Sequence, residues 1–212
     1  MPQKEARNEA IRRAKEKLAA DLASGRESVE QRCSRLGLPM PLPTDGSPRG
    51  AIDFPLFGSS ARLDLETLSL TDDAGAERSQ TDRILFYHYF LSDGIIRAGG
   101  ELISFRELTG GAFYWEPFRS RTCLPLAKKF GDDYARLRSA LDRFTWSEVA
   151  AGDFGARVHG FGELYLSLVA WSAEEGIAGE ISVLFDPAIK RVYEAEDAAV
   201  FASRICLKLL EA

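Results

Sequence analysis

Cysteine and histidine are scarce in this chain of 212 residues, and their scarcity excludes several kinds of site. The three cysteines, Cys33, Cys123 and Cys206, form no C-x-x-C pair, and the only histidines are His88 and His159. We therefore expect no structural zinc site and no four-cysteine iron–sulfur cluster held by this chain. An odd cysteine count also argues against a disulfide framework, and buried thiols that pack as small apolar groups are expected instead. A catalytic cysteine–histidine pair stays open, because such residues meet only in the fold.

Long apolar runs and an excess of basic residues are missing as well. The most apolar run, Leu164 to Trp171, has the length of a strand and is too short to cross a bilayer. Residues 1–20 are charged throughout and lack the apolar centre of a signal peptide, so we expect a cytosolic protein with no membrane partner. The net charge is −5, whereas nucleic-acid-binding proteins usually present a basic surface, so we expect no nucleic-acid partner.

The N-terminal quarter of the sequence reads as helices followed by a linker. Alanines and leucines recur every four residues in 3–24, which predicts a helix that stops at Gly25. A shorter helix closes at Gly37, and residues 38–50 then hold four prolines and two glycines. We therefore divide the chain into an N-terminal helical extension, 1–37, a Pro/Gly-rich linker, 38–50, and one domain, 51–212.

Helices and strands are grouped in the remaining sequence and do not alternate regularly. Strand-like runs in 51–70 precede an apolar helix that begins after Ser79, where Asp82 follows at capping-box spacing. Further strands are predicted at 101–105, 156–159, 163–171 and 180–185, and further helices at 113–130 with a break at Pro125, at 132–144 and at 196–210. This grouping predicts an α+β fold, with an antiparallel sheet packed against several helices.

The segment 103–126 holds the densest group of residues suited to binding a ligand. A Gly-Gly turn before a helix exposes N–H groups where the helix dipole favours negative charge, and arginines nearby clamp a carboxylate or phosphate. On a helix from Phe113, Trp115 and Arg119 share one face, and Tyr114, Phe118 and Arg121 share another. Arginines that simply pack on aromatic rings of the same helix are the alternative. The candidate ligand-binding residues are Arg106, Glu107, Gly110, Gly111, Tyr114, Trp115, Arg119 and Arg121.

Several pieces of the sequence, in this order, resemble a bacterial and archaeal family known as domain of unknown function 3786. They are DRILFYHYFL, ISFREL with the following GG and Y, a later FG, LFD and AED, and they extend from about Leu63 to Leu210. The chain departs from the family pattern at Thr109, where proline is usual, and at Gly176-Ile177, where Phe-Pro is usual. The resemblance implies occurrence in anaerobes and a link to corrinoid, one-carbon or iron–sulfur metabolism. It assigns no catalytic residue and no cofactor.

Three functions compete on this basis. The first is a binding domain for a small anionic or planar metabolite or cofactor at the 105–121 segment. The second is an enzyme in which Glu107 or His88 acts as acid or base and an arginine stabilises charge. The third is an interaction or assembly module, in which the N-terminal helices and the aromatic patch bind a protein partner such as a redox protein.

Overall fold

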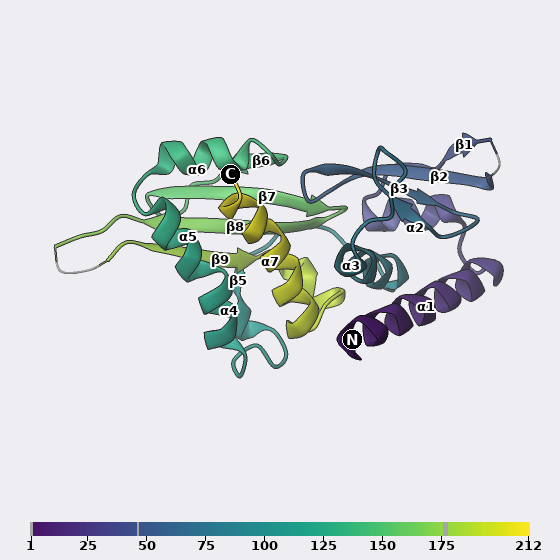
Figure 1. Cartoon of the computed structure of the whole chain (residues 1–212), viewed down its shortest axis with the longest axis horizontal. Helices are drawn as coiled ribbons and strands as arrows, with labels where there is room; N and C mark the ends of the chain where they lie inside the picture. The colour runs from purple at the N-terminus through teal and green to yellow at the C-terminus, as the bar shows by residue number, and fades with distance from the viewer. Residues whose placement is uncertain (1, 46, 176–177) are drawn as a thin grey trace. The chain divides into compact units, whose positions relative to one another are not determined.

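The computed structural model describes residues 2–45, 47–175 and 178–212 (Figure 1). The chain forms two compact units, Met1–Arg97 and Ala98–Ala212, and each is described by itself. Each unit contains one antiparallel sheet with its own helices, so the predicted α+β fold is confirmed. None of the helices in the described ranges combines the length and the apolar character that crossing a membrane requires.

The first unit is a four-stranded sheet with three helices. Its sheet has the order β1-β2-β3-β4, and every neighbouring pair is antiparallel. The apolar helix α3 supplies its core, where the ring of Phe86 stacks on that of Phe54 with centroids 4.5 Å apart. The elements are α1 (Pro2–Ala23), α2 (Val29–Leu36), β1 (Leu42–Thr44), β2 (Ser47–Leu56), β3 (Ser59–Asp64), β4 (Leu70–Thr71) and α3 (Gln80–Leu91).

The segment expected to be a linker, 38–50, contains β1 and the first residues of β2. Pro43 is compatible with β1 because this strand pairs only with β2, and an edge strand leaves N–H groups on one side unused. The two predicted helices before it are present, and Gly37 ends α2 with φ of 63°. Helix α1 packs against α3, and the boundary between compact units falls after Arg97. The separate status of residues 1–37 stays a prediction.

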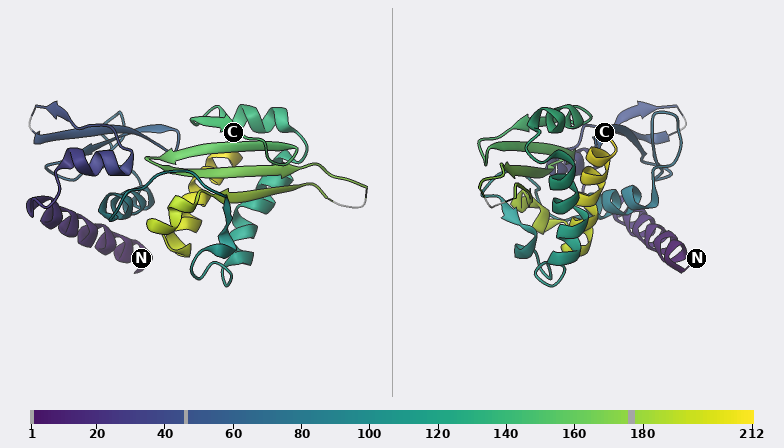
Figure 2. Two further views of the ribbon diagram at one scale, coloured as in Figure 1. Left: turned by 180° about the vertical axis from the view of Figure 1, so that it is seen from behind. Right: turned by 60° about the vertical axis from the view of Figure 1, so that its left-hand side comes forward.

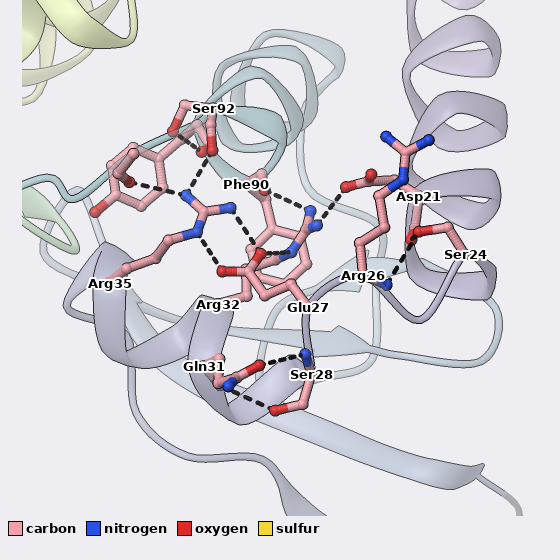
Figure 3. Close-up of polar contacts among 12 residues, drawn as sticks. Asp21, Ser24, Arg26, Glu27, Ser28, Gln31, Arg32, Arg35, Phe90 and Ser92 are labelled. Atoms are coloured by element: carbon pink, nitrogen blue, oxygen red, sulfur yellow. Dashed lines mark hydrogen bonds and ion pairs between the residues drawn. The ribbon is translucent and has the colours of Figure 1, made fainter.

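A buried arginine of α2 joins the three helices of the first unit (Figure 3). The side chain of Arg32 is only 4% exposed, and it forms ion pairs with Asp21 and, at 3.1 Å, with Glu27. It also donates a 3.0 Å hydrogen bond to the carbonyl oxygen of Phe90, in the last turn of α3. Arg35 pairs with the same Glu27 at 2.5 Å. The last carbonyl groups of a helix lack donors within the helix, and the guanidinium group of Arg32 supplies one to the carbonyl oxygen of Phe90.

The second unit is a five-stranded antiparallel sheet in the order β5-β9-β8-β7-β6. Helices α4, α5 and α7 lie on one face of the sheet, and the view from behind shows the strands in front of them (Figures 1 and 2). The predicted meander is confirmed by the antiparallel pairs β7–β8 and β8–β9. The elements are β5 (Ile103–Ser104), η1 (Phe105–Glu107), α4 (Trp115–Arg121), α5 (Cys123–Phe130), α6 (Tyr134–Leu141), β6 (Trp146–Glu148), β7 (Phe154–Phe161), β8 (Leu164–Trp171), β9 (Glu180–Phe185), η2 (Pro187–Arg191) and α7 (Ala195–Leu210).

The helix predicted over 113–130 is two helices, and the break lies at Thr122, so the predicted break at Pro125 is wrong. Pro125 is the third residue of α5, where a missing N–H costs nothing because the first turn has no intrahelical acceptor. Thr122 leaves the helical region with φ of −122° and ψ of −76°. Its hydroxyl donates a 2.7 Å hydrogen bond to the carbonyl oxygen of Phe118. The break at Thr122 therefore separates α4 from α5.

Candidate functional site

A cleft of about 420 Å³ opens between η1, α4 and β9 in the second unit. Its volume falls within the range typical of sites for small molecules. Three of the predicted ligand-binding residues, Arg106, Trp115 and Arg119, line it together. The complete lining consists of Ser104, Arg106, Trp115, Glu116, Arg119, Glu180, Ser182, Val183 and Leu184.

A buried aromatic stack fixes the helical wall of the cleft against the sheet. The rings of Phe105 in η1 and Phe118 in α4 are parallel within 1°, with centroids 4.0 Å apart. Both rings also contact Phe185 of β9, at 6.3 and 6.0 Å. All three side chains are buried, and offset aromatic contacts add to the free energy of burial. Arg106 follows Phe105 directly, and Trp115 precedes Phe118 by one turn, so the stack positions both.

The guanidinium group of Arg106 lies over the indole ring of Trp115, 4.5 Å from the ring centroid. Among the residues that the structure describes, this guanidinium group makes no hydrogen bond and no ion pair. Arg119 has one ionic contact, with Glu116 at 3.9 Å, which is too long for a hydrogen bond. The sequence predicted that Trp115 would pair with Arg119, whereas the structure pairs it with Arg106. Two arginines with free donors therefore face the same cleft.

Gly110 and Gly111 shape the turn between η1 and α4. Gly110 has φ of 80°, and a Cβ at Gly111 would lie 1.9 Å from the carbonyl oxygen of Phe105, so no larger residue fits there. The N–H of Gly111 donates to Leu108 at 2.8 Å and that of Phe113 donates to Gly110 at 3.2 Å. These donors are used inside the turn, and neither glycine lines the cleft. The turn positions the helical wall and offers few free N–H groups to an anion.

Glu107 lies outside the cleft lining and holds the start of η1. Its carboxylate accepts a 2.6 Å hydrogen bond from the N–H of Ser104. The N–H and then the hydroxyl of Ser104 lower the pKa of Glu107 below its usual value. A carboxylate held in this way is a weak base, which removes the main support for acid–base catalysis by Glu107. His88, the other candidate, is half-buried in α3 of the first unit, between the buried side chains of Tyr87 and Tyr89.

Tyr114 and Arg121 are exposed and do not line the cleft. Tyr114 is 63% exposed, and the adjacent Phe113 is 91% exposed. The predicted second pairing of an aromatic ring with an arginine on α4 is absent among the described contacts, because Phe118 turns inward to Phe105. The segment therefore presents two distinct surfaces, the cleft and an exposed aromatic pair.

The strand wall of the cleft was not found from the sequence. Glu180 and Ser182 come from β9, and the hydroxyl of Ser182 donates to the carboxylate of Glu180 at 3.0 Å. Alternation with buried Ile181 and Val183 indicates that both side chains lie on the less buried face of a strand. Their place beside α4 depends on the pairing of β5 with β9, for which the sequence carries no signal.

The remaining chemical candidates have structural roles. The buried carboxylate of Asp186 accepts hydrogen bonds from the N–H groups of Gly99, at 2.7 Å, and Ala188, at 3.0 Å. All three cysteines are free and buried, and burial raises the pKa of the Cys33 thiol to about 12 and that of the Cys123 thiol as well. Such thiols are poor nucleophiles. The described ranges contain no group of three or more His, Cys, Asp or Glu side chains placed to hold a metal ion.

With the cleft defined, comparison with known sequences assigns the family. The chain belongs to the domain of unknown function 3786 (DUF3786) family, whose sequence model matches residues 13–208. The resemblance is therefore confirmed, and it extends further towards the N-terminus than residue 63, to include α2 and half of α1. The departure at Gly176-Ile177 lies outside the described residues. No curated protein and no solved structure matched the chain.

Proposed function

We propose that this DUF3786 protein binds a small planar ligand that carries an anionic group, in the cleft between η1, α4 and β9. The observation that supports this most directly is the pair of arginines, Arg106 and Arg119, whose donors are free beside the ring of Trp115. A planar ring stacks on Trp115 or on the guanidinium plane of Arg106, and the anion accepts hydrogen bonds from Arg119. No reaction is assigned.

Arg62, a surface arginine elsewhere in the chain, is an example of a guanidinium group that is fully paired with a carboxylate. Arg62 makes hydrogen bonds of 2.7 and 2.8 Å to both oxygens of Asp53, in the two-pronged geometry that arginine and carboxylate prefer. Within the part of the chain that the structure describes, the one ionic contact of Arg119 is that of 3.9 Å to Glu116. A ligand carboxylate would therefore gain charge-assisted hydrogen bonds without first breaking a strong ion pair, and such bonds are worth about 1.5–3 kcal/mol.

The family resemblance also suggested corrinoid or iron–sulfur metabolism, and neither group enters the proposal. Iron–sulfur clusters need thiolate ligands. The cleft lining contains neither cysteine nor histidine, and it is largely polar and charged. A small organic anion matches these residues better.

The test is a titration of the full chain with 3-phenylpropionate, a planar monocarboxylate, followed by tryptophan fluorescence. Excitation at wavelengths where the phenyl ring does not absorb makes the indole rings the reporters, and Trp115 lies in the cleft. We expect saturable binding that Arg119→Gln weakens about tenfold, because it loses a charge-assisted hydrogen bond. Arg121→Gln is the matched control, since Arg121 is exposed two residues further along and lies outside the lining.

Two results would overturn the proposal. One is the absence of saturable binding of 3-phenylpropionate up to its solubility limit. The other is an equal loss of affinity in Arg119→Gln and Arg121→Gln, which would mean that general positive charge, and no defined cleft, attracts the anion.

A second candidate function is supported by the exposed aromatic pair. Phe113 and Tyr114 are 91% and 63% exposed, next to the turn in which Gly111 approaches the backbone of Phe105 closely. Exposed aromatic side chains of this kind are frequent anchors of protein interfaces. If they join two copies of this chain, sedimentation velocity will show concentration-dependent association that Phe113→Ser abolishes. A single species at every concentration would remove this candidate.

A further inference from the structure

The charges in the cleft are balanced, and this balance restricts the class of ligand. Two arginines, Arg106 and Arg119, and two glutamates, Glu116 and Glu180, line it, so their formal charges sum to zero. Sites for phosphate esters usually concentrate positive charge or helix N-termini on the anion. A polyanion in this cleft would meet two carboxylates as well as two guanidinium groups. A ligand that carries one negative and one positive group matches the lining better.

The two signs are distributed over two walls. The helical wall, η1 and α4, supplies both arginines, together with Trp115 and Glu116, whereas β9 supplies Glu180 and Ser182. Among the described residues, the carboxylate of Glu180 forms no ion pair, and its hydrogen bond comes from the neutral hydroxyl of Ser182 at 3.0 Å. Its charge is therefore available to a cation. Glu148, an exposed glutamate of the same sheet, is by contrast paired with Arg138.

We propose that the ligand is a zwitterion with a planar ring, of the kind represented by an aromatic amino acid. This inference rests on the proposed function, because it places the carboxylate at the arginines of the helical wall. The ring stacks at Trp115 and Arg106, and the ammonium group donates to Glu180 and Ser182 on the strand wall. Binding across both walls explains why uncommitted groups of both signs face one cleft.

Three probes with the same phenyl ring separate the contributions. Phenylalanine carries both charged groups, 3-phenylpropionate carries only the carboxylate, and 2-phenylethylamine carries only the ammonium group. We expect phenylalanine to bind the full chain about tenfold more tightly than either of the others, since each charge-assisted hydrogen bond contributes independently. Tryptophan fluorescence again gives the affinities.

The assignment of each wall follows from matched variants. Glu180→Gln is expected to reduce the affinity for phenylalanine about tenfold, to that of 3-phenylpropionate, and to leave 3-phenylpropionate binding unchanged. Arg119→Gln is expected to reduce the affinity for phenylalanine to that of 2-phenylethylamine, and to leave the binding of 2-phenylethylamine unchanged. Glu101→Gln is the control, because Glu101 is exposed in the same unit and lies outside the lining.

The outcomes distinguish this inference from the proposed function. If 3-phenylpropionate binds and depends on Arg119, but phenylalanine binds no more tightly, the anion site stands and the zwitterion is wrong. The zwitterion is also wrong if Glu180→Gln weakens both ligands equally. If none of the three probes binds, both proposals fail.

Discussion

Arg32 in the first unit and the two arginines of the cleft differ in the partners of their guanidinium groups. Arg32 is 4% exposed, forms ion pairs with two carboxylates and donates to a helix-terminal carbonyl, so its charge is paired within the fold (Figure 3). Among the described residues, Arg119, whose side chain is 42% exposed, has one ionic contact of 3.9 Å, and Arg106 stacks on Trp115 and forms no ion pair. The same residue type thus supports structure in one unit and is left available in the other. Partners and burial, more than residue type, separate the two roles.

The largest expected effect is a loss of stability when the buried Arg32 is replaced. Arg32→Met removes a buried charge and leaves the carbonyl of Phe90 without its donor, so we expect a loss of about 3 kcal/mol in the free energy of unfolding. Urea denaturation followed by far-ultraviolet circular dichroism measures it. Arg62→Met, which breaks an exposed pair with Asp53, should cost less than about 1 kcal/mol. Equal losses would show that the buried network carries no special weight.

A smaller loss is expected from the turn that positions the cleft. In Gly111→Ala the new methyl group would meet the carbonyl oxygen of Phe105 at 1.9 Å, so the backbone must move. We expect a cost of about 2 kcal/mol. All three tryptophans lie in the second unit, so tryptophan fluorescence during denaturation reports on that unit. Gly110→Ala is the control, because Gly110 lies in the same unit and has φ of 80° but no atom near its Cβ, and it should cost about 1 kcal/mol.

The ion pair between Arg32 and Asp21 should make the stability of the protein depend on pH at acidic values. The hydrogen bond from Arg32 is the main cause that lowers the pKa of Asp21 below its ordinary value of 3.8. A carboxyl whose pKa is lower in the folded state stabilises the fold above the unfolded pKa, and this contribution is lost as the pH falls through the folded pKa. Wild type should therefore lose stability below about pH 4 more steeply than Asp21→Asn. Parallel curves in urea denaturation over this range would contradict the pairing.

The smallest expected effect on stability is that of replacing Arg119 in the cleft. Arg119→Gln removes a charge whose one ionic contact among the described residues is a long, exposed ion pair, so the free energy of unfolding should change by less than about 0.5 kcal/mol. The same denaturation experiment checks it. A loss of more than about 1 kcal/mol in the free energy of unfolding is the size expected of a structural interaction, and it would show that Arg119 stabilises the fold.

Much of the fold could be predicted from local patterns. The four-residue spacing of alanine and leucine gave α1, Ser79 placed the start of α3, where its side chain accepts the N–H of Asp82, and alternation gave the β7–β8–β9 meander. The linker reading of 38–50 followed from proline content, but β1 is an edge strand that tolerates Pro43. Gly94, Gly99 and Gly100 flank the division after Arg97, but glycines of this kind mark any loop, and the division itself depends on contacts between distant residues.

The site could be predicted only in part, for a similar reason. Arg106, Trp115 and Arg119 lie close in sequence and were found together, whereas Glu180 and Ser182 join them through strand pairing. The sequence predicts free N–H groups at the Gly-Gly turn, whereas the N–H of Gly111 donates to Leu108 within the turn, a geometry that the residue types alone do not specify. Local chemistry identified the helical wall, and only the fold supplied the strand wall.

The most direct test of the central claim compares 3-phenylpropionate with its uncharged amide, 3-phenylpropionamide, on wild type and on Arg119→Gln. The two ligands have the same shape and differ in charge, so the ratio of their affinities isolates what the protein gains from the anion. We expect wild type to favour the carboxylate about tenfold and Arg119→Gln to show no preference. A preference that survives the substitution unchanged would contradict the claim that Arg119 is left free by the fold in order to bind an anion.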